Sequence, residues 1–355
     1  MVSKGVFLYQ KDRKAVRLYH LTNGVITADV INAAGAIVRL LVPDKNGVLT
    51  DIILGSRDLG DYAYNNSFFG SVIGRYANRI GGGGFTLNGK RYDLQHNDMV
   101  GRPTDTNLHA GPVSWNHVVW NVVEEETDDR KITMTYRSPD MESGFPGNVD
   151  AKMVYTITDD NALSLEYFAK SDKDTYVNMS NHSSFNMAGH DSGSCLDHLF
   201  TINADYFMPV NDISVPTGEL RSVKGTPFDF TSPKPLGQDI GADDDQLRYG
   251  DGYDHNFCIN GEGLRFCARV KDPKEGRVMT VYTTCPGVQL YSGNAFGWAF
   301  RTIPCKDNAR YTKNGAFCLE TGYYPDTPNK PQFPSCLLKA GEAYHEQTIF
   351  AFSAE

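Results

Sequence analysis

The sequence lacks the hydrophobic segments that mark membrane and secreted proteins. None of its 355 residues belongs to a run of eighteen apolar residues, the length that suggests a membrane-spanning helix. The N-terminal segment MVSKGVFLYQKDRKAV contains no apolar stretch of signal-peptide length. We therefore expect a protein that neither crosses a membrane nor is secreted, and the cytoplasm is its simplest location.

The chain also lacks any run of lysine and arginine. Its formal net charge is -9, and its charged residues, 22% of the total, are spread along the sequence. Proteins that bind nucleic acids or anionic membranes concentrate positive charge on one segment or face. We expect no nucleic-acid or membrane partner, and a neutral or weakly polar small molecule fits this composition better.

Cysteine pairs of the kind that bind zinc are missing as well. The seven cysteines are odd in number, widely spaced and contain no CxxC pair, so they indicate neither a zinc site nor a complete disulfide framework. We expect reduced thiols at Cys195, Cys258, Cys267, Cys285, Cys305, Cys318 and Cys336.

Amphipathic stripes with a helical period are short or missing, whereas apolar and polar residues alternate from end to end. Turn-forming pairs separate these runs, as expected for strands joined by tight turns. The turns lie at Asn23-Gly24, Asn46-Gly47, Asn88-Gly89, Asp160-Asn161 and Lys274-Glu275-Gly276. No Gly- or Pro-rich linker interrupts the chain. We predict an all-β protein, one large β-sandwich domain over residues 1–355 with few short helices.

Several stretches place hydrogen-bonding side chains beside apolar runs. The stretches are GSVIGRYANRIGGG with Arg75, Asn78 and Arg79, NLHAGP with His109, NMSNHSSFNMAG with His182, YDHNF with Asp254, PGVQLYSGN with Gln289, and CLETGYYPDTPN with Glu320. Taken alone, each has an ordinary structural explanation, such as an arginine in a surface ion pair. Burying a carboxylate at the end of an apolar strand costs free energy unless its charge is paired, so the position of Glu320 suggests a specific role.

These residues give little support for a metal site or for a serine nucleophile. Metal ligands on a helix need short spacings, which we do not find among His109, His182, Asp254, His255 and Glu320. We predict no metal, although ligands on separate strands could converge. Ser183 and Ser184 follow His182, but the chain contains no GxSxG motif. Adjacency of serine and histidine in sequence is not the geometry of a catalytic triad.

Eight motifs in a fixed order resemble the aldose 1-epimerases, also called galactose mutarotases. They are GRYANRI, NLHAGP, SGFPG, NHSSFNMAG, YDHNF, PGVQLYSGN, CLETGYYPDTPN and LKAGEAYHEQTIFAF, and the similarity runs from about residue 20 to the C-terminus. The resemblance implies a β-supersandwich with a shallow sugar cleft and no cofactor. It also implies an isomerase that interconverts the α and β anomers of hexoses such as galactose and glucose by opening the ring, rotating about C1–C2 and reclosing.

The same resemblance implies roles for individual residues. It makes Glu320 the general base, His182 the general acid and His109 a second active-site histidine. The residues that it implies for holding the sugar are Asn78, Arg79, Asp254 and Gln289. Arg75, in the same motif as Arg79, ranks lower as a direct contact, and either Phe296 or Trp298 could stack on an apolar sugar face.

The neighbours of His182 suggest how its ring is held. An acid aimed at a ring oxygen must keep one orientation, and we expect the side chains of Asn181, Ser183, Ser184 and Asn186 to hold the imidazole by hydrogen bonds.

Three positions depart from the usual family pattern. Ala110 stands where most members have glycine, and its methyl group could crowd the turn or demand a negative φ. Ser184 stands in place of an aromatic residue, and Gly322 in place of glutamine. None of these changes removes an acid, a base or a charge, so they bear on sugar preference more than on the reaction.

Two other functions remain open at this point. The chain could be a non-catalytic carbohydrate-binding protein on the same scaffold, since a fold does not fix a function. It could also be an epimerase or isomerase that acts on a sugar phosphate or another lactol. A sugar phosphate would call for additional cationic residues near the motifs, which the sequence lacks. We expect a small sugar as partner and a monomer or weak homodimer.

Overall fold

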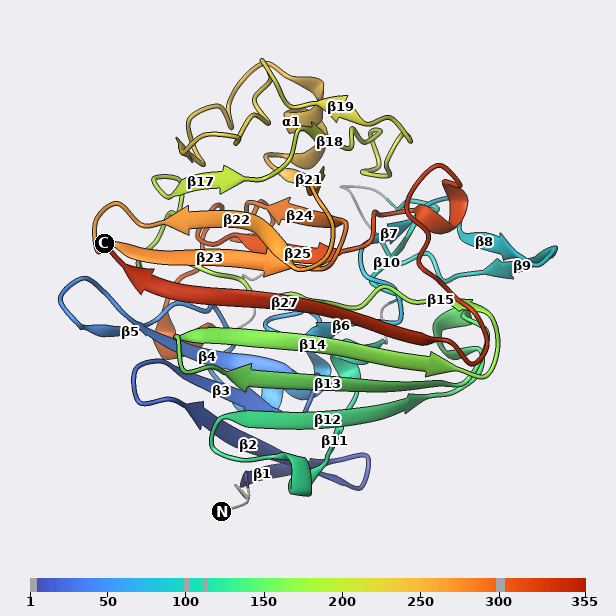
Figure 1. The fold of residues 1–355 in the computed structure, drawn as a ribbon, viewed down its shortest axis with the longest axis horizontal. Coiled ribbons are helices and arrows are strands. Elements are labelled where there is room, and N and C mark those ends of the chain that lie inside the picture. Colours follow the sequence, from blue (N-terminus) through green and yellow to red (C-terminus); the bar gives the residue numbers. More distant parts are fainter. Residues whose placement is uncertain (1–4, 99–102, 112–113, 298–303) are drawn as a thin grey trace.

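The computed structural model describes residues 5–98, 103–111, 114–297 and 304–355, and antiparallel strands dominate them (Figure 1). The largest sheet has nine strands in the order β11-β12-β13-β14-β27-β23-β22-β17-β20. Their bounds are β11 Asn121–Val122, β12 Lys131–Ser138, β13 Val149–Ile157, β14 Ala162–Ser171, β27 Ala343–Ala354, β23 Arg277–Thr283, β22 Arg265–Lys271, β17 Leu199–Ile202 and β20 Lys234–Pro235.

Two five-stranded sheets pack with it. The N-terminal sheet is a meander of β1 Val6–Lys11, β2 Lys14–Thr22, β3 Thr27–Ile31, β4 Ala36–Pro43 and β5 Leu49–Asp51. The other sheet has the order β19-β18-β21-β24-β25, with β19 Arg221–Ser222, β18 Tyr206–Phe207, β21 Asp254–Cys258, β24 Gly287–Tyr291 and β25 Cys318–Gly322.

Four two-stranded sheets complete the strands of the described residues. They pair β6 Val72–Ile73 with β16 Ser180–Asn181, β7 Arg79–Ile80 with β10 Asn107–Leu108, β8 Gly84–Leu87 with β9 Lys90–Asp93, and β15 Thr175–Tyr176 with β26 Leu337–Leu338. Helical segments in the same residues are short: α1 Asp245–Gly250 and the 3-10 turns η1 Leu59–Tyr64, η2 Trp115–His117, η3 Glu124–Glu126, η4 Glu142–Gly144, η5 Lys306–Asn308 and η6 Thr327–Asn329.

The turn residues act as the sequence predicts. Asn23-Gly24 separates β2 from β3, Asn46-Gly47 separates β4 from β5, and Asp160-Asn161 separates β13 from β14. In the hairpin of β8 and β9, Asn88 and Gly89 have φ values of 50° and 76°, the left-handed pair that a two-residue turn of type I′ requires. Local turn chemistry therefore fixes the register of these hairpins.

Alternating burial shows how the sheets form one sandwich core. In β13 every second side chain is buried, while those between them face outward or are half-buried, which is the period of a sheet with one face on the core. The main apolar cluster combines residues of β2 to β4, β12 to β14, β22 to β25 and β27. The nine-stranded sheet thus packs over the other two, and the predicted all-β sandwich is confirmed.

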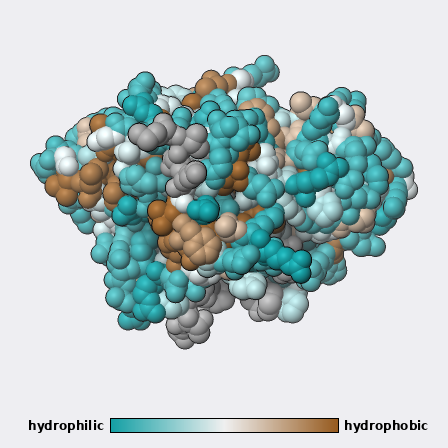
Figure 2. Space-filling view, turned by 90° about the horizontal axis from the view of Figure 1, so that it is seen from below, coloured by the Kyte–Doolittle hydropathy of each residue, from teal (hydrophilic) through white to brown (hydrophobic). Residues whose placement is uncertain are grey.

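The surface of the described residues combines polar and apolar side chains. The face in Figure 2 is mainly hydrophilic with separate apolar patches, and the exposed large apolar side chains of the described residues include Val6 and Phe7 on the edge strand β1. Scattered apolar side chains of this kind are normal on a folded protein. No helix within the described ranges is long and apolar enough to span a membrane. None of the seven cysteines forms a disulfide bond.

Candidate active site

One face of the sheet formed by β21, β24 and β25 carries a row of polar side chains. Asn256 of β21 lies directly opposite Gln289 of β24, which lies directly opposite Glu320 of β25. Because side chains two residues apart share a face, Asp254 lies on this face too. The row of Asn256, Gln289 and Glu320 is buried, with exposed fractions of 4%, 3% and 7%, respectively.

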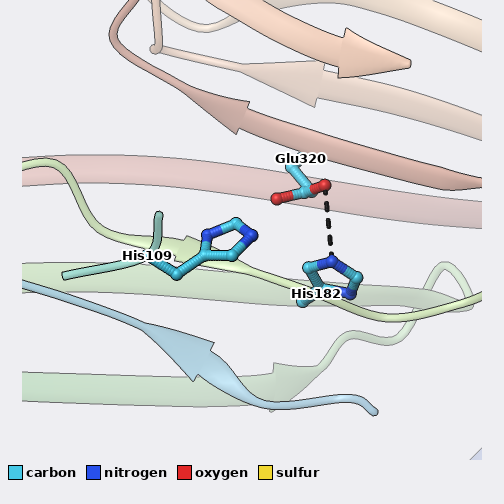
Figure 3. A group of neighbouring side chains, drawn as sticks. All are labelled: His109, His182 and Glu320. Atoms are coloured by element: carbon cyan, nitrogen blue, oxygen red, sulfur yellow. Dashed lines mark ion pairs between the residues drawn. The ribbon is translucent and has the colours of Figure 1, made fainter. Parts of the chain in front are cut away.

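Two histidines reach the same place from short strand pairs elsewhere in the chain. His182 directly follows β16, which pairs with β6, and His109 directly follows β10, which pairs with β7. Figure 3 shows both imidazoles beside the Glu320 carboxylate. His182 Nε2 lies 3.7 Å from Glu320 Oε1, and the two imidazole rings meet edge to face with centroids 5.4 Å apart.

His109 is held as a neutral hydrogen-bond donor. The backbone N–H of Asn78 donates to His109 Nδ1 at 3.1 Å, so the imidazole proton lies on Nε2. Burial lowers the pKa of His109 well below its ordinary value, and the nearby positive charges of His182 and Arg79 lower it further. His109 therefore stays uncharged at neutral pH and can donate one hydrogen bond through Nε2.

His182, unlike His109, is charged at neutral pH. Burial alone lowers its pKa, but the Glu320 carboxylate and the Cys318 thiol raise it more, to about 10. The ring is therefore an imidazolium at neutral pH. Burial raises the pKa of Glu320, an effect that the charge of His182 offsets only in part and that Asp254 reinforces. The pair combines a charged acid with a carboxylate made more basic by its surroundings.

The polar neighbours of His182 do not hold its ring, contrary to the prediction. The Asn181 amide donates to Gly70 O at 2.9 Å and accepts from the Ser183 hydroxyl at 2.6 Å. The Asn186 amide donates to two backbone carbonyls. Within the described residues, His182 Nδ1 instead faces Cys318 Sγ at 3.8 Å. The asparagines and serines therefore fix the loop, and Cys318 faces the imidazole itself.

Arg79, Asp254 and Gln289 form one connected group, as their motifs suggested. Arg79 Nη1 lies 3.2 Å from Asp254 Oδ2, and Gln289 Nε2 donates to Asp254 Oδ1 at 2.7 Å. Arg79 Nε also donates to Asp98 Oδ2 at 2.6 Å. Burial opposes the charge of Arg79, but the two carboxylates outweigh it and raise its pKa. Asn78 lies beside this group and accepts from Arg79 N at 2.8 Å.

Arg75 is not part of this group and instead binds a neighbouring loop. It is 1% exposed, and its guanidinium donates to the Ser138 hydroxyl and to the carbonyls of Pro139, Phe145 and Pro146. All three of its nitrogens thus have partners inside the protein. Arg75 holds the loop around residues 138–146, which accounts for its lower rank as a sugar contact.

The three departures from the family pattern are accommodated without distortion of the active site. Ala110 keeps a left-handed φ of 62° and packs in a small apolar cluster, so its methyl group has not forced a negative φ. Ser184 Oγ lies 3.5 Å from Cys318 Sγ. At Gly322, an added Cβ would lie 2.8 Å from Asn178 Oδ1, so this position is closed to larger side chains unless Asn178 moves.

Three residues that contact the predicted site residues were missed by the sequence analysis. Asp98 pairs with Arg79, Cys318 faces His182, and the Phe68 ring packs on both imidazoles, with centroids 4.9 Å from His109 and 5.7 Å from His182. A single carboxylate or aromatic residue in a loop carries no local signal of this kind.

The two aromatic residues proposed to stack on the sugar do not form that surface in the described part of the chain. Phe296 is 4% exposed and belongs to a core cluster, and Trp298 lies outside the described residues.

The two histidines and Glu320 also have the composition of a metal site. One ligand atom from each of His109, His182 and Glu320 lies within 4.8 Å of the others. A metal ion would need a deprotonated His182, whereas its neighbours keep this ring protonated up to a pKa of about 10. A metal ion at these residues would therefore have to displace the proton on His182.

Comparisons with known proteins agree with this geometry. The aldose 1-epimerase family profile matches residues 17–351. A galactose mutarotase from Bos taurus is 40% identical over 341 residues, 95% of this chain and 94% of that protein. An aldose 1-epimerase from Escherichia coli (strain K12) is 35% identical over 349 residues, 97% of each chain. The solved structure of an aldose epimerase homologue from C. elegans superposes with a TM-score of 0.85 at 26% identity, covering 96% of this chain and 99% of that one.

The fold and these relatives thus place the chain among isomerases of the sugar-mutarotase class. The chain belongs to the aldose 1-epimerase family, which confirms the resemblance drawn from its motifs.

Asp98 offers a test of the ion-pair group around Arg79. The variant Asp98→Ala leaves the buried Arg79 with one carboxylate partner, so we expect the free energy of unfolding to fall by about 3 kcal/mol. Urea denaturation followed by circular dichroism measures this change. The matched control is Asp93→Ala, which removes a carboxylate paired with Arg91 on the surface and should alter stability little. Equal effects of the two variants would contradict the assignment.

Proposed function

We propose that this protein interconverts the α and β anomers of hexoses such as galactose and glucose, with Glu320 as general base and His182 as general acid. The observation that carries the proposal is the buried pair itself: a carboxylate oxygen 3.7 Å from an imidazole nitrogen, in a site where burial raises the pKa of Glu320. Membership of the aldose 1-epimerase family supports the same reaction.

Ring opening needs two proton transfers. The Glu320 carboxylate removes the proton of the C1 hydroxyl, a carbonyl forms at C1 as the bond from C1 to the ring oxygen breaks, and His182 delivers a proton to that oxygen. Rotation about C1–C2 presents the other face of the aldehyde. Closure then reverses both transfers, with protonated Glu320 as acid and neutral His182 as base. Positioned acids and bases contribute about 10²–10⁴-fold each.

His109 fits the same chemistry as a fixed donor. Its Nε2–H is free to meet a substrate oxygen because Nδ1 already accepts from the Asn78 backbone. A neutral donor stabilises negative charge that develops on an oxygen without competing with His182 for the proton.

The residues that we propose to hold the sugar are Asn78, Arg79, Asp254 and Gln289. Gln289 Oε1 and Glu320 Oε2 are buried and have no hydrogen-bond partner within the described residues. Unpaired buried oxygens are costly, and sugar hydroxyls would supply the missing donors. Arg79 and Asp254 are charged, and charged partners strengthen hydrogen bonds to hydroxyl groups.

The alternatives fit the site less well. A sugar phosphate needs free cations, whereas Arg79 is already neutralised by Asp98 and Asp254. A non-catalytic binding protein has no use for a costly buried pair such as His182 and Glu320.

We also propose that residues 1–355 form a single domain that acts in the cytoplasm as a monomer or weak homodimer. One continuous apolar cluster that draws on the early, middle and late strands supports the single domain. Seven cysteines without a disulfide bond suit a reducing compartment.

The variant Glu320→Gln tests the base directly. It keeps the shape of the side chain and removes its charge, so the rate of anomer interconversion should fall by about 10²–10⁴-fold with the fold preserved. Polarimetry of freshly dissolved α-D-galactose and α-D-glucose measures the rate, after subtraction of the spontaneous reaction. A fully active variant would refute the role given to Glu320.

The pH dependence follows from the two pKa shifts. The base must be deprotonated, so activity should be lost as pH falls through the pKa of Glu320, which lies above its ordinary value of 4.5. The acid must be protonated, so activity should be lost as pH rises through the pKa of His182, near 10. The measurement is kcat/KM against pH. An alkaline loss centred near the ordinary histidine value of 6.5 would contradict the pairing.

Chelation tests the absence of a metal from the reaction. Because both proton transfers use side chains of this chain, we expect dialysis against EDTA to leave kcat unchanged. Loss of activity on dialysis, with recovery on addition of Zn²⁺ or Mn²⁺, would assign the two histidines and Glu320 to a metal instead.

A further inference from the structure

Asn256 is an unusual member of the polar row on β21, β24 and β25. Its side chain is 4% exposed, yet Oδ1 has no hydrogen-bond partner within the described residues. Two other buried asparagines use their amides inside the protein: Asn178 bonds the backbone of Ala77 and Tyr323, and Asn294 bonds Gly250 and Tyr253. Leaving a buried amide unpaired costs free energy, so Asn256 needs a partner from outside the chain.

Asn256 does not stand alone in this respect. It lies across from Gln289, and Gln289 lies across from Glu320. Each of the three has one buried oxygen without a partner: Asn256 Oδ1, Gln289 Oε1 and Glu320 Oε2. Three neighbouring acceptors, one of them a carboxylate oxygen, favour a ligand that donates hydrogen bonds and disfavour an anion.

The next rung of the same sheet leaves room beside this row. Gly287 and Gly322 lie opposite each other, two residues from Gln289 and Glu320 on the same face. A Cβ at Gly287 would lie 2.4 Å from Asn256 Oδ1, so glycine is required for the amide to lie there. Asn256, Gln289, Glu320 and Gly322 line a small pocket with about 10 Å³ of free space, which suits a single water-sized group.

A hydroxyl group meets all of these requirements. It is as large as one water molecule, it is uncharged, and it donates to an acceptor. We propose that Asn256 is a further sugar-binding residue, which together with Gln289 binds one hydroxyl of the substrate other than the anomeric hydroxyl at Glu320. The inference rests on the proposed function for the identity of the ligand as a sugar, and it adds a contact that sets which sugars are accepted.

A series of deoxy sugars combined with the variant Asn256→Ala tests this contact. We expect kcat/KM for mutarotation of glucose to fall about tenfold in the variant, the effect of one lost hydrogen bond to a buried group. For one sugar among 2-deoxy-, 3-deoxy-, 4-deoxy- and 6-deoxyglucose, native protein and variant should be equal, because the hydroxyl that meets Asn256 is already missing. An equal loss for every sugar, or no loss for glucose, would overturn the inference.

Two controls separate binding from stability. Asn294→Ala removes a buried amide that bonds only within the protein, so it should lower the melting temperature without changing the ratios between sugars. Asn256→Ser replaces Asn256→Ala if the latter does not fold, and the same pattern is expected.

Failure of the proposed function would be seen separately. If native protein accelerates no mutarotation, the proposed reaction is wrong, and titration calorimetry with glucose and the same deoxy sugars then tests the contact by affinity. A native affinity for glucose that Asn256→Ala weakens, with no effect on one deoxy sugar, supports the contact. No binding of glucose by the native protein overturns it.

Discussion

The burial of the Glu320 carboxylate 3.7 Å from the His182 imidazole is the constraint on which the rest of the site depends. A carboxylate that is 7% exposed is unstable unless its charge is matched and its oxygens find donors. His182 matches the charge at Oε1, while Oε2 is left without a partner in the described residues. Glu320 Oε2 is therefore available to accept a hydrogen bond from a ligand.

Two kinds of structural element position the side chains of this site. Continuous ladders of backbone hydrogen bonds join the strands β21, β24 and β25. These strands hold the polar row of Asn256, Gln289 and Glu320 in a fixed register. The histidines come from residues that directly follow two short strand pairs. Their surroundings give the two histidines different charge states. A backbone N–H and burial keep His109 neutral, and the Glu320 carboxylate keeps His182 positively charged. Two chemically identical side chains thus obtain different roles from their neighbours.

Much of the fold could be predicted from the sequence because its signals are local. Turns such as Asn88-Gly89 and the alternation in β13 depend on a few adjacent residues, and both appear where expected. The candidate site residues could be named only by their resemblance to a family. Their convergence depends on strand pairing between distant segments, which no local pattern reports.

The errors and omissions have the same physical origin. The polar neighbours of His182 were expected to hold its ring, but their side chains bond other groups. The contact to Nδ1 comes from Cys318, 136 residues away. Asp98 lies in a loop, and it was overlooked because its partner Arg79 lies 19 residues away on β7. Asn256 was overlooked for the opposite reason: what distinguishes it is a missing partner, which only a structure can reveal.

A charged His182 and a neutral His109 share one buried site with Glu320. Nitrogen NMR of the imidazoles in the unliganded protein, recorded across a pH titration, distinguishes these two charge states. We expect His182 to keep protons on both nitrogens until pH approaches 10, and His109 to carry one proton, on Nε2, throughout the neutral range. A His182 that is neutral at pH 7, or a His109 that carries two protons there, would refute this assignment of charges.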